Sequence, residues 1–153
     1  MMATPRRPIS LLLVDDDPSI LRLLTTLIER SFRDQIELKS LTEAKDARSW
    51  IEQNVVDVLV TDLEMPEVNG LELLRCAKRR NACTQVLFIT GNSTFDALTD
   101  ALELGATDYL LKPLDQNEVV ELIDDAMRRQ RRWATAMAGT LAAQREHAAA
   151  PVA

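Results

Sequence analysis

The sequence predicts an α/β domain built on a parallel sheet, and two observations support this. Short apolar segments alternate five times with stretches whose apolar residues recur at helical spacing. The segments 9–14, 57–61 and 85–90 are almost purely apolar, as expected for strands buried on both faces of a parallel sheet. Five strand-then-helix units imply a doubly wound sheet with helices on both faces.

The strands and helices follow in order. The second strand alternates more between apolar and polar residues, which predicts an edge strand. Asp17 is a capping residue before Pro18 in the first turn of the first helix, and Thr42 is predicted to cap the second. The predicted strands are 9–14, 36–41, 57–61, 85–90 and 107–112. The third, fourth and fifth helices are predicted to start at Gly70, about Thr94 and near Gln116. Gly105 is predicted to end the fourth helix.

The composition narrows the functional class. The 153 residues carry a net charge of −6, which argues against nucleic acid as a direct partner and suits a cation or a basic protein surface. Cys76 and Cys83 match no metal motif and no disulfide framework. The apolar run 9–14 stops at three aspartates, so we expect neither a signal peptide nor a membrane span, and a cytoplasmic location.

Three regions are expected: a tail over 1–8, one domain over 9–128, and a helical extension with a frayed end over 129–153. A helix over 117–147 would be about 46 Å long, more than packs on the sheet. Trp133, Met137 and Leu141 form an apolar stripe on it. We expect the stripe to pair with a second copy or a partner protein; the alternatives are a linker to an output domain outside this chain, or a frayed tail.

Polar residues follow four of the predicted strands. Asp15 and Asp16 follow the first, Asp62 the third, Thr90 ends the fourth and Lys112 the fifth. In such a sheet ligands bind beyond the carboxyl ends of the strands, so these side chains should meet at one rim. Crowded carboxylates call for a cation, and an oxygen-only cluster suits Mg²⁺. A hydroxyl and an ammonium complete a site for a phosphoryl group, with aspartate as a competent nucleophile.

The sequence resembles the CheY-like receiver domains of two-component response regulators over residues 9 to about 128. The most specific similarity is the stretch with Asp62, Met65–Pro66 and Gly70. The matching stretches are LLLVDDDPSIL, DVLVTDLEMPEVNGLELL, VLFITG and GATDYLLKPL. The resemblance implies a flavodoxin-like fold with strand order 2-1-3-4-5.

The resemblance also implies a role for each site residue. Asp62 would accept the phosphoryl group from a histidine kinase or a phosphotransfer protein, and no residue that the family requires is missing. It implies that Asp15, Asp16, Asp62 and the Glu64 carbonyl bind Mg²⁺, and that Thr90 and Lys112 contact the phosphoryl oxygens. It also implies a cis Lys112–Pro113 bond and an aromatic switch residue at Tyr109. Glu64 and Asn92 would tune the rate of dephosphorylation.

The chain is thus expected to be a regulatory domain, not an enzyme, acting on a downstream protein or by self-association through the fourth helix, fifth strand, fifth helix and extension. Two alternatives remain. An aspartate-nucleophile phosphatase needs a DxD pattern on an early strand and a capping insertion, whereas Glu64 replaces the second Asp here. A phosphorylation-independent scaffold or dimerisation module is the other.

Overall fold

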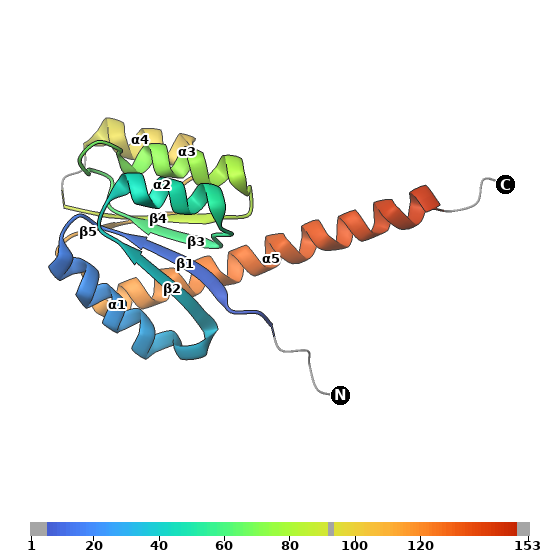
Figure 1. Cartoon of the computed structure of the whole chain (residues 1–153), viewed down its shortest axis with the longest axis horizontal. Coiled ribbons are helices and arrows are strands. Elements are labelled where there is room, and N and C mark those ends of the chain that lie inside the picture. The colour runs from blue at the N-terminus through green and yellow to red at the C-terminus, as the bar shows by residue number, and fades with distance from the viewer. Residues whose placement is uncertain (1–5, 92–93, 150–153) are drawn as a thin grey trace.

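The computed structural model describes residues 6–91 and 94–149 and shows a five-stranded parallel sheet between two layers of helices (Figure 1). The strand order is β2-β1-β3-β4-β5, which confirms the predicted doubly wound fold and its edge strand. The strands are β1 (Ile9–Val14), β2 (Ile36–Leu41), β3 (Val58–Thr61), β4 (Gln85–Thr90) and β5 (Asp108–Leu111).

Each helix follows one of these strands, and the helices start close to the predicted residues. They are α1 (Pro18–Phe32), α2 (Ala44–Gln53), α3 (Gly70–Arg80), α4 (Phe95–Glu103) and α5 (Gln116–Ala149), with a short 3-10 helix η1 (Arg33–Gln35) after α1. One capping prediction was wrong: Glu43, not Thr42, precedes α2, and it makes no side-chain capping bond. The packing of Ala44, Ala47 and Ile51 on the core therefore fixes α2 without a capping side chain.

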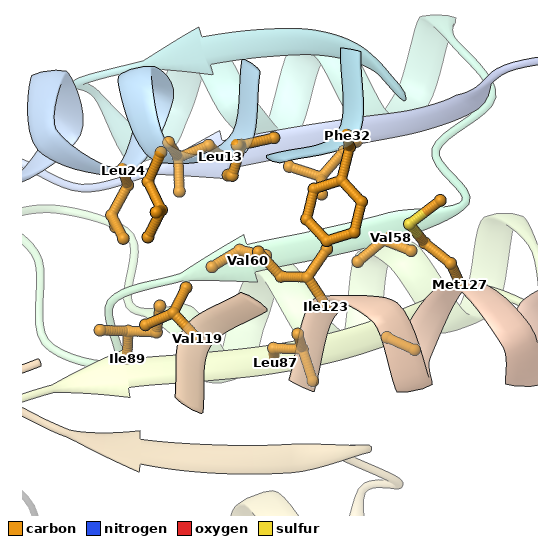
Figure 2. Packing of buried hydrophobic residues seen from close by; sticks show 14 of the residues in the cluster. Leu13, Leu24, Phe32, Val58, Val60, Leu87, Ile89, Val119, Ile123 and Met127 are labelled. Carbon is orange, nitrogen blue, oxygen red and sulfur yellow. The ribbon is translucent and has the colours of Figure 1, made fainter. Parts of the chain in front are cut away.

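Alternate residues of each strand point to opposite faces of the sheet and form two cores. Figure 2 shows the core that α1 and α5 cover, where Leu24, Phe32 and Ile123 meet Val60 of β3. The second core lies under α2, α3 and α4 and includes Phe88 of β4. Since both faces are covered, the functional residues can reach solvent only at the strand ends.

The last helix runs well beyond the sheet. α5 has 34 residues, about 50 Å at 1.5 Å per residue, and Figure 1 shows its second half projecting from the domain. The last α5 residue buried in the domain is Gln130, and Trp133, Met137 and Leu141 beyond it are each about half exposed. None of the helices in the described ranges combines the length and apolar character that a bilayer crossing requires.

A buried polar cluster at the opposite end of β3 from Asp62 holds three segments together. Asp57 is fully buried and accepts two hydrogen bonds from the Arg7 guanidinium, at 2.7 and 2.8 Å. The Ser10 amide donates to the same carboxylate at 2.9 Å and the Gln130 side chain at 3.1 Å. Residue 7 of the predicted tail is therefore attached to the domain at the point where α5 leaves it.

Removing the Asp57 carboxylate should destabilise the fold. In Asp57→Ala the Ser10 amide and the Gln130 side chain lose a buried acceptor, and we expect a loss of about 1–3 kcal/mol in the free energy of unfolding. Arg7→Ala should cost less, because the Arg7 side chain is 61% exposed and can be hydrated. Urea unfolding measures both. Equal midpoints for Asp57→Ala and the unmodified chain would contradict a stabilising role.

Candidate phosphoryl-transfer site

The register of the parallel strands brings the two key carboxylates together. Val14 of β1 is paired with Thr61 of β3, so the next residues, Asp15 and Asp62, leave the sheet side by side. The Asp62 amide donates to the Val14 carbonyl at 3.1 Å, which extends this pairing by one step. Asp15 is 1% exposed and Asp62 is 8% exposed. Both residues are thus buried at the carboxyl end of the sheet.

Lys112, which follows the edge strand β5, joins the two carboxylates at the same end of the sheet. Its Nζ lies 3.0 Å from Asp15 Oδ2 and 3.0 Å from Asp62 Oδ2. The Lys112 amide donates to the Thr90 carbonyl at 2.9 Å, so β4 and β5 fix its backbone. The Lys112–Pro113 peptide bond is cis. One ammonium therefore bridges residues 50 and 97 positions away in the chain.

The remaining rim residues lie as follows. Asp16 is exposed, and one carboxylate oxygen of each of Asp15, Asp16 and Asp62 falls within 4.8 Å of the others. Thr90 ends β4 and is 1% exposed. The exposed Glu64 donates its amide to Asp62 Oδ1 at 3.2 Å.

Burial and charge act against each other here. Burial raises the pKa of Asp15; the Asp17 amide and Lys112 pull it down, but the pKa stays above its ordinary value. Burial lowers the pKa of Lys112. Its hydrogen bonds to Asp15 and Asp62 and their negative charges together raise the pKa by more, so the net shift is upward. The rim holds three carboxylates, and the single Lys112 ammonium contacts two of them. The rim keeps an excess of negative charge, and its oxygen-only donors fit a hard divalent cation such as Mg²⁺.

The loop after Asp62 closes against a glycine. The Gly70 amide donates to the Leu63 carbonyl at 2.8 Å, and a Cβ at residue 70 would lie 2.5 Å from the Asp62 carbonyl oxygen. Only a residue without a side chain allows α3 to start this close to Asp62. The glycine after the predicted acceptor therefore has a steric role in placing it.

Other predicted residues lie outside this cluster. Asp17 caps α1 by accepting the Ser19 amide at 2.8 Å, and so serves the helix, as expected. Tyr109 on β5 is half-buried, and its ring centroid lies 6.3 Å from that of Phe88. Trp133, Met137 and Leu141 are on the projecting part of α5. Asn92 lies outside the described residues.

Sequence reasoning missed the Asp57 cluster. Its signal was present: an acidic residue opens an otherwise apolar segment, and Gln130 continues the periodicity of the buried residues Val119, Ile123 and Met127. What the sequence could not give is that these two residues share Arg7 as a neighbour.

Comparisons with known proteins identify the family. The family model for the response regulator receiver domain matches residues 11–124. The chain belongs to this family, a regulatory domain of two-component signalling.

Three relatives illustrate the similarity. The response regulator protein PilR of Pseudomonas aeruginosa is 33% identical over 117 residues, which are 76% of this chain and 26% of PilR. The transcriptional regulatory protein ZraR of Salmonella typhimurium is 31% identical over 139 residues, 91% of this chain and 31% of ZraR. A crystal structure of a receiver domain from Clostridium thermocellum is 28% identical with a TM-score of 0.73, and the match covers 82% of this chain and 98% of that domain. The chain thus spans less than a third of these two regulators.

Proposed function

We propose that Asp62 accepts a phosphoryl group in an Mg²⁺-dependent reaction. The observation that carries this proposal is the Lys112 ammonium 3.0 Å from both Asp15 and Asp62, at a rim that also holds Asp16 and ends β4 with Thr90. Family membership supports it, because receiver domains generally bind Mg²⁺ at an acidic pocket. The arrangement supplies a nucleophile, a fixed cation and a cluster of metal ligands.

Each residue has a chemical task in the proposed reaction. An Asp62 oxygen attacks phosphorus, the phosphorus–nitrogen bond to a donor imidazole breaks, and the imidazole leaves with the electron pair. Lys112 neutralises charge on the phosphoryl oxygens, and the Thr90 hydroxyl donates a hydrogen bond to one of them. Asp15, Asp16, Asp62 and the Glu64 carbonyl would hold Mg²⁺, which when bound shields the incoming oxygens from the carboxylates. Glu64 and Asn92 would tune the rate of hydrolysis.

The donor is proposed to be a histidine of another protein, a sensor histidine kinase or a phosphotransfer protein in the cytoplasm. The chain's single histidine, His147, is exposed and lies near the end of α5, whose second half projects away from the domain. His147→Ala is therefore expected to leave phosphorylation unchanged, and it serves as a control for an internal relay.

Incubation with acetyl phosphate and Mg²⁺, followed by intact-mass measurement, tests the function. A stable gain of one phosphoryl group supports the proposal. Continuous hydrolysis of the donor at many turnovers per chain would indicate a phosphatase, and an unchanged mass with no hydrolysis would indicate a scaffold. Continuous hydrolysis would overturn the role as a stable switch, and an unchanged mass would overturn the proposed role of Asp62 as acceptor.

We further propose that the phosphorylated site alters a protein-binding surface. Thr90 would move toward the phosphoryl group and Tyr109 would turn into the space it leaves, next to Phe88. The helix α4 and the strand β5 already expose large apolar side chains: Phe95 is 82% exposed, Leu102 74% and Leu111 56%. With the stripe on the projecting part of α5, this surface would contact a downstream protein or a second copy.

Activation should change self-association or partner binding by about 5–150-fold, the usual range of coupling between two sites. Sedimentation with and without beryllofluoride, a phosphate mimic, measures self-association. The variant Trp133→Ser/Met137→Ser/Leu141→Ser, which keeps every charge of α5, should reduce this difference while leaving phosphorylation intact. If the variant responds to beryllofluoride as the unmodified chain does, the stripe takes no part in the switch.

A further inference from the structure

The exposed face of α5 changes sign along its length. Glu121, Asp125, Arg128 and Arg132 are all exposed and follow one another at spacings of four, three and four residues, so they lie in one row. The row is called the charge stripe here. It lies opposite the buried residues of α5, which are Val119, Ile123, Ala126, Met127 and Gln130.

Charge is segregated over the whole chain in the same way. Residues 9–127 contain 23 acidic and 11 basic side chains, whereas residues 128–149 contain five arginines and one glutamate. The net charge of −6 hides this division. The boundary falls at the middle of the charge stripe, between Asp125 and Arg128.

Interactions within one chain account for Arg128 but not for the other arginines of the basic half. The helix dipole favours arginine only in the last turn, and α5 continues for 17 residues beyond Arg132. Arg128 has its own partner, Asp124, at 3.1 Å and also contacts Asp125. Within residues 6–91 and 94–149, no carboxylate forms an ion pair with Arg129, Arg131 or Arg132. Burial lowers the pKa of Arg131, and the nearby charge of Arg6 lowers it further, as expected where positive charges crowd.

We propose that the charge stripe pairs with the charge stripe of a second copy, with the two α5 helices antiparallel. A two-fold interface must be self-complementary, and a row that reads acid, acid, base, base is complementary to itself only when one copy is reversed. Glu121 then faces Arg132 of the other copy, and Asp125 faces its Arg128. A parallel arrangement would put like charges opposite each other.

The middle of the stripe has a rigid support. Ala126, Met127 and Gln130 are buried on the far side of the helix, and Gln130 is hydrogen-bonded to Asp57. The side chains of the stripe therefore project from a fixed stretch of backbone, which reduces the entropy lost on association. The projecting part of α5 extends beyond this stretch and need not take part.

The pairing should be weak and sensitive to salt, because exposed ion pairs contribute little and are screened. The screening length falls from about 10 Å at 0.1 M salt to about 3 Å at 1 M. Self-association of the unphosphorylated chain should therefore be measurable at low salt and decrease at 1 M. The pairing does not depend on phosphorylation, so its failure would leave the role of Asp62 untouched.

A charge swap tests the pairing with two single variants of the full chain. Glu121→Arg makes the stripe mostly positive, and Arg132→Glu makes it mostly negative; neither residue belongs to the Arg128 ion pairs. Sedimentation at low salt should show each variant associating about tenfold more weakly than the unmodified chain, since the change reverses two contacts by symmetry. An equimolar mixture should associate again, because each variant then faces the opposite charge.

Arg145→Glu is the matched control, with the same change of charge on an exposed residue of α5 outside the stripe. It should associate like the unmodified chain. Circular dichroism checks that each variant keeps its helix content. Incubation with acetyl phosphate checks that each variant is still phosphorylated. The proposal is overturned if the unmodified chain is monomeric at low salt, if the single variants associate normally, or if their mixture stays monomeric.

Discussion

Asp62→Ala should show no phosphoryl incorporation from acetyl phosphate or from a cognate kinase. The substitution removes one of the two carboxylates that the Lys112 ammonium contacts, and the other belongs to Asp15. Asp15 is the less suitable acceptor, because it is 1% exposed and one of its oxygens is held by the Asp17 amide. Intact-mass measurement after incubation with Mg²⁺ and the donor is the direct readout.

The fold should survive this change. Asp62 contributes its side chain to the rim and not to either core, and removing one of three crowded carboxylates relieves repulsion. Asp62→Asn keeps the shape of the side chain and should be equally inactive. Asp17→Asn is the matched control on the same rim: it retains a capping oxygen for the Ser19 amide and should be phosphorylated normally. Full incorporation in Asp62→Ala would show that another residue is the acceptor.

The sequence predicted the rim because parallel topology converts position along a strand into position in space. Asp15, Asp62 and Lys112 are far apart in the chain, but each directly follows a strand, and strands of a parallel sheet end on the same side. The apolar segments were long and regular enough to show where each strand ends. No knowledge of side-chain conformations was needed for this step.

The features that were missed depend on tertiary contacts. Nothing in the sequence connects Arg7, Asp57 and Gln130, which are separated by 50 and 73 residues and meet only after the sheet has formed. The cap at Thr42 was wrong for a related reason: a favourable residue type is a weak preference, and core packing decided where α2 begins. Net charge is a sum over the chain, so it says nothing about the division of charge along α5.

Mg²⁺ should raise the melting temperature of the unmodified protein. A cation that binds the native rim alone adds about 2.7 kcal/mol to the free energy of unfolding at a hundredfold excess over its dissociation constant. Asp16→Ala should remove most of this gain, because it takes one of the three clustered carboxylates away while the exposed side chain makes no contribution to the core. A melting curve in sodium chloride at the same ionic strength separates Mg²⁺ binding from the screening of charges by salt. Identical melting curves with and without Mg²⁺ would argue against a cation site.

The raised pKa of Asp15 gives this effect a pH dependence. Because burial raises that pKa, the folded protein binds a proton at Asp15 more tightly than the unfolded chain does. The metal-free protein therefore gains stability as the pH falls through the folded pKa, and this contribution is lost as the pH rises through it. Mg²⁺ requires the ionised carboxylate, so its stabilising effect should shrink as the pH falls from neutrality.

Asp15→Asn separates these two contributions. The amide carries no charge at any pH, and its oxygen can still accept the Asp17 amide. At neutral pH without metal this variant should melt at a higher temperature than the unmodified chain, because the buried charge that opposes folding is gone. It should also lose the response to Mg²⁺, which needs that charge. A metal-free variant that melts at a lower temperature would show that the contacts of the ionised Asp15 carboxylate with Lys112 outweigh the cost of burying it, and the pH dependence expected here would be wrong.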